Sequence, residues 1–154
     1  MEIVEQFYED YVIGSSRETV GRTMTEADIV LHAGQTGDFY PHHMDAEWCA
    51  TQPFERRVAH GTLVMSMAVG MTAGDINTRA MSYGYDRVRF VRPVHIGDTL
   101  KVRAEITAKY DHKKRPQELG MAEETVTVTN QDGEVVLVLV HLYVVEKRSG
   151  SGAD

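Results

Sequence analysis

The chain has 154 residues, enough for one domain with a hydrophobic core. Its 23 acidic residues outnumber its 16 Lys and Arg residues, and the net charge of −7 argues against a nucleic-acid binder, whose affinity rests on neutralising phosphates. The single cysteine, Cys49, excludes an internal disulfide. The N-terminal stretch is acidic and no apolar run reaches about 20 residues, so we expect neither a signal peptide nor a membrane span. Together these features lead us to expect a cytoplasmic protein.

Two helices are predicted in the first half of the chain, which otherwise has the composition of loops. Thr25 is a good N-cap and acidic residues follow it, so we expect a helix over residues 26–36. Asp45 plays the same part for a short helix over residues 46–50, which Pro53 ends.

The segment between these helices carries a carboxylate and an imidazole five residues apart, on Asp38 and His43. Pro41 fixes φ and discourages helix at Tyr40, so we expect a rigid turn. The two groups can share one water and withdraw its proton as it attacks an alkene, since an imidazole titrates near pH 6.5. An Asp turn cap beside a surface histidine is the alternative interpretation.

The next predicted element is a helix that begins at Gly61 and is apolar on nearly every side through Met71. Such a helix is expected to be buried all round. Its first N–H groups have no intrahelical partner and, with the helix dipole, can hold a developing oxyanion. Glycine at this position lets a thioester approach the backbone closely. An ordinary helix start is the alternative interpretation.

The second half of the chain changes to an alternation of polar and apolar residues. The expected strands cover residues 86–92, 99–106, 125–129 and 135–145. Turn residues separate them at 96–98 and 130–133. A buried helix followed by a four-stranded antiparallel run predicts the α+β class.

Three blocks of this sequence follow a known order of motifs. Residues 38–45 resemble D-x-N-P-[apolar]-H-x-[D/N] apart from two positions. Residues 54–61 fit F-x-x-x-[apolar]-[apolar]-H-G, and residues 88–100 contain R-F-x-x-P-V-x-x-G-D-x-L. Together they resemble the MaoC-like, (R)-specific enoyl-CoA hydratase family over roughly residues 25–146. The resemblance implies a hot-dog fold, an antiparallel sheet wrapped around a central apolar helix. We expect one such domain over residues 1–148 and a disordered tail over 149–154.

The resemblance also implies an enzyme of fatty-acid metabolism that hydrates an enoyl-CoA or dehydrates a 3-hydroxyacyl-CoA. Asp38 and His43 would form the catalytic acid–base pair, and the Gly61 N–H would bind the thioester carbonyl. The rest of the expected substrate-binding set is Tyr40, Val58, His60 and Ser66. Ser66 has an alternative interpretation as a small polar residue in a tight helix contact. No metal is expected, and no cofactor other than coenzyme A as part of the substrate.

Two residues depart from the family motif beside the expected reacting atoms. Tyr40 replaces the usual Asn, and His42 replaces the usual apolar residue. These changes suggest an acyl group other than a plain short enoyl chain. They also keep open a non-catalytic acyl-CoA-binding or regulatory role. An acyl-CoA thioesterase on the same fold is a further alternative, but many of those need an acid on the central helix and residues 62–73 contain none.

Other candidate sites receive less specific interpretations. The basic segment 111–116 could hold the phosphates of coenzyme A or be a solvated hairpin loop. A metal site of His42, His43 and His60 has no known ligand spacing. The other histidines receive structural interpretations: His32 packs within its helix, His95 belongs to a turn at a strand end, and His141 belongs to a strand. Because one sheet leaves an edge to protect, and the family pairs two units, we predict a homodimer or a dimer of dimers with the acyl channel at its interface.

Overall fold

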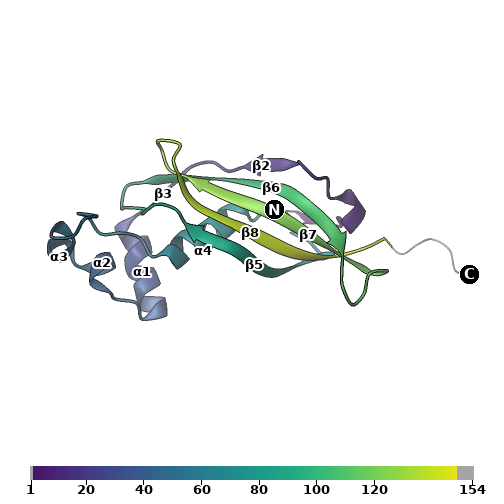
Figure 1. Cartoon of the computed structure of the whole chain (residues 1–154), viewed down its shortest axis with the longest axis horizontal. Coiled ribbons are helices and arrows are strands. Elements are labelled where there is room, and N and C mark those ends of the chain that lie inside the picture. Colours follow the sequence, from purple (N-terminus) through teal and green to yellow (C-terminus); the bar gives the residue numbers. More distant parts are fainter. Residues whose placement is uncertain (1, 149–154) are drawn as a thin grey trace, which may run out of the picture.

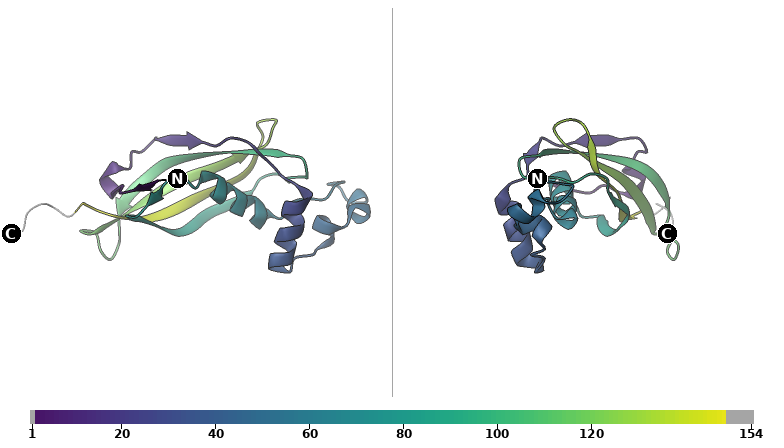
Figure 2. Two further views of the ribbon diagram at one scale, coloured as in Figure 1. Left: turned by 180° about the vertical axis from the view of Figure 1, so that it is seen from behind. Right: turned by 60° about the vertical axis from the view of Figure 1, so that its left-hand side comes forward.

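Four long strands from the second half of the chain form one antiparallel sheet that curls around a helix (Figures 1 and 2). They are β5 (Ala80–Phe90), β6 (Thr99–Asp111), β7 (Leu119–Thr129) and β8 (Val135–Glu146). The strand order is β2-β6-β7-β8-β5, with β2 (Ser16–Glu18) at one edge, and β3 (Arg22–Thr23) also pairs with β6. The computed structural model describes residues 2–148. The predicted α+β class and hot-dog fold are confirmed.

Helix α4 (Gly61–Thr72) lies against the concave face of the sheet, and three other helices lie beyond its N-terminal end (Figures 1 and 2). These are α1 (Glu26–Thr36), α2 (Pro41–Met44) and α3 (Ala46–Ala50). The predicted spans of α1 and α3 are confirmed because their local caps form. Thr25 accepts a hydrogen bond from the N–H of Asp28, and Asp45 accepts one from the N–H of Trp48.

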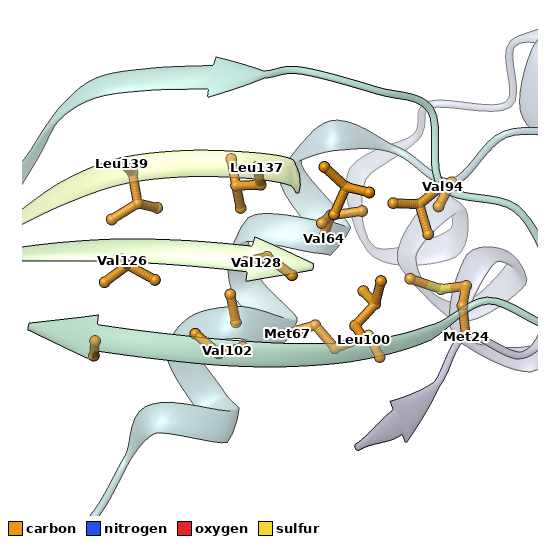
Figure 3. Packing of buried hydrophobic residues seen from close by; sticks show 14 of the residues in the cluster. Met24, Val64, Met67, Val94, Leu100, Val102, Val126, Val128, Leu137 and Leu139 are labelled. Carbon is orange, nitrogen blue, oxygen red and sulfur yellow. The ribbon is translucent and has the colours of Figure 1, made fainter. Parts of the chain in front are cut away.

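The apolar core lies between α4 and the sheet (Figure 3). Val64 and Met67 contribute from α4, one turn apart. Alternate residues of three neighbouring strands face them: Val102 on β6, Val126 and Val128 on β7, Leu137 and Leu139 on β8. The two-residue period of the strands therefore directs one apolar face toward the helix.

The first half of the chain contains more strand than its sequence indicates. Besides β2 and β3, the strand β1 (Ile3–Val4) pairs in parallel with β4 (Ile76–Asn77), and a 3-10 helix, η1 (Tyr8–Asp10), follows β1. Each of these strands is two or three residues long, too short to show an alternating pattern.

Two of the long strands begin earlier than predicted, β5 at residue 80 instead of 86 and β7 at residue 119 instead of 125. In β5 the register shifts beside Gly84, and in β7 the neighbouring acids Glu123 and Glu124 interrupt the alternation. The pairing with β8 continues through both interruptions. The hydrophobic pattern therefore understates both strands at their N-terminal ends.

The prediction that α4 is buried on every side is wrong for the single chain. Thr62, Ser66 and Gly70 are exposed and lie four residues apart along one face of α4. The sheet covers the opposite face, which carries the buried residues Val64, Met67 and Ala68. This exposed stripe is available for contact with a second molecule.

Residues 2–12, here called the N-terminal clasp, cross the far end of the sheet. The Tyr8 ring lies against Gly120 of β7, where an added Cβ would be 2.1 Å from the ring. The Nζ atoms of Lys109 and Lys147 lie 4.5 and 5.2 Å from the centroid of that ring. Asp10 pairs with Arg148, just beyond β8, at 2.8 Å. The clasp thus joins the start of the described chain to its end.

Residues 149–154, expected to be a disordered tail, lie outside the described residues. Within residues 2–148, none of the helices is long and apolar enough to cross a membrane.

Candidate active site

The candidate acid–base pair lies beyond the N-terminus of α4. Gly37 ends α1 in the left-handed conformation, with φ of 79°, and the chain turns there into Asp38. Pro41 occupies the first position of α2, so the expected rigid turn is in fact a short helix that carries His43. The carboxylate Oδ2 of Asp38 lies 3.9 Å from Nε2 of His43. This distance is too long for a hydrogen bond, and one oxygen atom could contact both groups.

The hydrogen bonds of His43 define its tautomer. Nδ1 lies 2.6 Å from the carbonyl oxygen of Val58, which can only accept, so Nδ1 carries the hydrogen. Nε2 then has a free lone pair that faces Asp38. Burial lowers the pKa of His43, against an opposing effect of the bond to Val58. His43 is therefore a neutral base at physiological pH.

His60 packs against the Asp38 and His43 pair and does not line the apolar pocket next to Gly61. Its side chain is 2 % exposed, its ring stacks on His43 with centroids 3.7 Å apart, and its Nε2 donates to the backbone oxygen of Asp38 at 2.9 Å. The structure thus places the His60 side chain away from the pocket, and its expected role in substrate binding stays a prediction. The side chain is enclosed because it connects the Asp38 loop to the first turn of α4.

The side chains of Asp38, His43 and His60 lie close enough together to suggest a metal site. Oδ2 of Asp38, Nε2 of His43 and Nε2 of His60 all lie within 4.8 Å of one another. However, Nε2 of His60 donates its hydrogen to the Asp38 carbonyl, so it has no lone pair for a cation. Only two of the three groups could act as ligands in this arrangement, fewer than a typical protein metal site uses.

Gly61 begins α4 beside an apolar pocket of about 240 Å³. Residues lining this pocket include Val58, Gly61, Val64, Phe90, Val94 and Val136. Among the described residues, the N–H of Gly61 has no hydrogen-bond partner, as expected for the first position of a helix. The pocket thus combines an apolar wall with a free backbone donor.

Phe90 is the residue of this pocket that the sequence did not single out. An added Cβ on Gly61 would be 2.8 Å from the end of the Phe90 ring, so only glycine allows this contact. Phe90 belongs to the R-F-x-x-P block, which could have pointed to it. Its ring is 54 % exposed and can therefore move.

The other expected site residues are distributed around this centre. Val58 lines the pocket and also holds His43 through its carbonyl oxygen. Tyr40 is 66 % exposed and packs edge-on against His42, whose ring stacks on His43. Ser66 lies on the exposed stripe of α4 and does not line the pocket. The single chain therefore assembles Asp38, His43, Gly61 and Val58, and leaves Ser66 outside.

The basic segment 111–116 lies in the hairpin between β6 and β7, at the opposite end of the sheet from α1–α3 (Figures 1 and 2). Its Arg115 pairs with Glu118 of the same loop. This position favours a solvated hairpin loop. It argues against a site for coenzyme A phosphates, which would have to lie nearer to Gly61.

Comparison with known proteins is consistent with this geometry. The model of the MaoC like domain matches residues 10–130. The chain is 30 % identical to an (R)-specific enoyl-CoA hydratase of Rhodospirillum rubrum, over 73 % of this chain and 78 % of that protein. It is 40 % identical to Protein MaoC of Klebsiella aerogenes over 64 % of its own length, which spans only 30 % of that protein.

A solved structure named Monoamine oxidase regulatory protein, from an Archaeoglobus species, superposes with a TM-score of 0.87 and 34 % identity, over 94 % of this chain and 96 % of that one. The matched residues 10–130 include Asp38, His43 and Gly61. This chain is a member of the MaoC-like domain family.

Proposed function

We propose that the protein hydrates a trans-2-enoyl-CoA to an (R)-3-hydroxyacyl-CoA and catalyses the reverse dehydration. A water between Asp38 and His43 gives a proton to Nε2 of His43 as its oxygen adds to C3 of the alkene. The proton is then returned to C2. The Gly61 N–H, at the positive end of α4, stabilises the negative charge that develops on the thioester oxygen.

The observation that carries this proposal is the position of the free Nε2 lone pair of His43, 3.9 Å from Oδ2 of Asp38. The bond from His60 to Asp38 supports it, because it attaches the same loop to the helix that begins with Gly61. The names of related proteins add support, since one of them is an (R)-specific enoyl-CoA hydratase.

The test is the loss of ultraviolet absorbance of the enoyl thioester when crotonyl-CoA is mixed with the protein. A set of enoyl-CoAs that differ in length and branching would then identify the acyl group. Catalysed loss of absorbance by the wild type, abolished in Asp38→Asn, supports the proposal. Saturable binding without any loss of absorbance contradicts it.

We also propose a homodimer formed through β5. This strand is an edge of the sheet, and its exposed side chains include Met81, Tyr83 and Phe90, at 74, 67 and 54 %. Light scattering should give twice the mass of the chain. Tyr83→Lys should weaken the dimer, whereas Val20→Lys, at a residue that is 87 % exposed before β3, should not.

A non-catalytic acyl-CoA-binding protein is the second candidate. The regulatory name of the Archaeoglobus protein favours it, together with the Tyr40 and His42 departures. In that case, Asp38→Asn would leave the affinity for crotonyl-CoA unchanged and no variant would affect turnover.

A further inference from the structure

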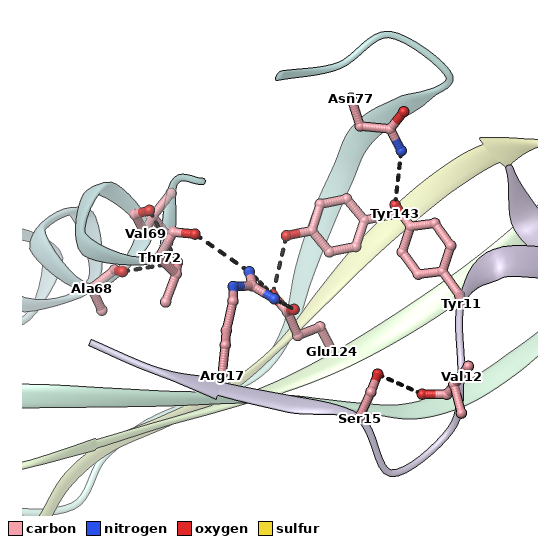
Figure 4. A network of polar contacts seen from close by, with 10 residues as sticks. All are labelled: Tyr11, Val12, Ser15, Arg17, Ala68, Val69, Thr72, Asn77, Glu124 and Tyr143. Carbon is pink, nitrogen blue, oxygen red and sulfur yellow. Dashed lines mark hydrogen bonds and ion pairs between the residues drawn. The ribbon is translucent and has the colours of Figure 1, made fainter. Parts of the chain in front are cut away.

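A second group of polar side chains lies at the C-terminal end of α4, outside the hydratase site (Figure 4). It surrounds a cavity of about 500 Å³, the size of a small-molecule site. The walls come from the N-terminal clasp, the end of α4 and the sheet, and include Tyr11, Arg17, Ser82, Glu124 and Tyr143. The twelve residues of α4 put this end about 18 Å from Gly61.

The concave face of the sheet changes its chemistry where α4 ends. Along β7 the inward residues run from Val128 and Val126 to Glu124, and along β8 from Leu137 and Leu139 to His141. Glu124 and His141 are directly opposite each other and are 1 % and 7 % exposed. Buried polar side chains are costly unless they are paired, and apolar residues of similar volume would stabilise this part of the core as well. These polar residues therefore suggest a function.

Ser82 and His141 lie at the distance expected for a nucleophile and its general base. Ser82 on β5 lines the cavity and is exposed, and its Oγ lies 2.7 Å from Nε2 of His141 on β8. The rings of Tyr85 and Tyr143 flank the imidazole, with centroids 4.4 and 4.0 Å from it. The imidazole is thus held in one orientation against the serine.

The charges around His141 suit a general base. Burial lowers its pKa, Glu124 acts in the opposite direction, and Arg17 lowers it further. The imidazole is therefore neutral near pH 7 and can accept a proton. Arg17 and the hydroxyl of Tyr143 both donate to Glu124, which keeps this carboxylate in place next to the imidazolium that would form.

We propose that Ser82 is the nucleophile of a second site, which takes an acyl group from an ester or thioester. Oγ of Ser82 attacks the carbonyl carbon while its proton moves to Nε2 of His141. The bond from carbon to the alcohol or thiol breaks, and this leaving group takes the proton from His141. Water then releases the acid from Ser82 by the same route. The Tyr11 hydroxyl, whose oxygen accepts from Asn77 at 3.2 Å, keeps its own proton for the developing oxyanion.

The proposal assigns a function to a histidine that the sequence analysis expected to be structural. It does not depend on the hydratase, because Asp38, His43 and Gly61 do not line this cavity. It is also compatible with pairing through β5. Such pairing occupies backbone groups of the strand edge, whereas the Ser82 side chain faces the cavity.

The first experiment treats the intact protein with a fluorophosphonate probe and maps the labelled serine by mass spectrometry. We expect Ser82 to react, with a rate that rises with pH as the imidazole loses its proton. Ser66 is the matched control, because it is also exposed but has no histidine partner among the described residues. Labelling of Ser82 no faster than Ser66, or a rate that does not follow a single ionisation, would overturn the proposal.

The second experiment measures acyl transfer from p-nitrophenyl acetate and, separately, from acetyl-CoA. Ser82→Ala should abolish both the burst of p-nitrophenolate and the acetyl group on the peptide that contains residue 82. His141→Gln should slow the burst about 10²–10⁴-fold. Reaction with only one donor identifies the kind of ester. A burst that survives in folded Ser82→Ala contradicts the proposal, and Ser66→Ala, at the matched control serine, should retain the full burst.

Discussion

The imidazole of His60 donates a 2.9 Å hydrogen bond to the backbone oxygen of Asp38, twenty-two residues earlier in the chain. His60 also immediately precedes Gly61, the first residue of α4. One buried side chain therefore sets the position of the candidate carboxylate relative to the free amide of the helix.

His60→Phe should lower kcat of the hydratase while preserving the ring stack on His43. Loss of one hydrogen bond should cost about 1 kcal/mol of stability and, through displacement of Asp38, roughly tenfold in kcat. The matched control is His95→Phe, since His95 makes a similar bond to the Arg57 carbonyl at 3.0 Å without contacting Asp38. Equal kcat values for the two variants in the crotonyl-CoA assay would rule out this positioning role.

The two neighbouring histidines should differ sharply in their effect on turnover. His43→Gln and Asp38→Asn should each lower kcat about 10²–10⁴-fold, the usual contribution of an acid–base group. His42→Gln should retain kcat within about tenfold. Among residues 2–148, Nδ1 of His42 is buried without a partner, whereas Nε2 of His43 faces Asp38. Steady-state kinetics with crotonyl-CoA checks this, and a larger loss in His42→Gln would reverse the assignment.

Gly61→Ala should raise KM for enoyl-CoA with little loss of stability. The new Cβ would lie 2.8 Å from the exposed end of the Phe90 ring, which can move but would then intrude on the apolar pocket. Phe90→Ala in the same chain should restore KM. Gly70→Ala on the same helix meets nothing within 4 Å and should stabilise by about 0.5–1 kcal/mol without changing KM. An unchanged KM in Gly61→Ala would mean that the pocket does not hold the acyl group.

Stability should fall as the pH is lowered through about 6.5. Burial lowers the pKa of His32, His43 and His141 below their ordinary value of 6.5 in the folded state. Below that pH the unfolded chain binds more protons, so the free energy of unfolding decreases until the folded-state pKa values are passed. Urea unfolding at pH 7.5 and 5.5 measures the difference. The difference in unfolding free energy between the two pH values should be smaller in His141→Gln. A stability that rises on acidification in this range would contradict the prediction.

Gly120→Ala should detach the N-terminal clasp. Its Cβ would lie 2.1 Å from the Tyr8 ring, and overpacking of this kind costs about 1–3 kcal/mol. The added Cβ of Gly84→Ala, in the edge strand β5, meets nothing within 4 Å among the described residues, so this variant should change stability far less. Differential scanning calorimetry compares the two, and limited proteolysis should cut Gly120→Ala within residues 2–12.

The parts of this fold that depend on local interactions could be predicted from the sequence. Helix α1 follows from Thr25 and its cap, and both of its bounds agree with the structure. The pair Asp38 and His43 is close in the chain, so one short turn and helix suffices to bring them together. The sequence motif was enough to select these two residues. The tautomer of His43 is known only from the structure, through its contact with Val58.

The parts that depend on distant segments could not be predicted. Nothing near His60 in the sequence indicates that its ring binds the Asp38 carbonyl, so a substrate contact was expected of it. The exposure of Ser66 depends on which face of α4 the sheet covers. Ser82 and His141 meet only because β5 pairs with β8, fifty-nine residues apart.

The N-terminal clasp has a consequence for how the protein is made. The guanidinium of Arg148 lies over the Phe7 ring and pairs with Asp10, so these early residues need a partner that follows β8 in the chain. A ribosome releases the clasp before it releases this partner. During translation the far end of the sheet and the cavity at Ser82 therefore stay open until β8 and Arg148 have emerged.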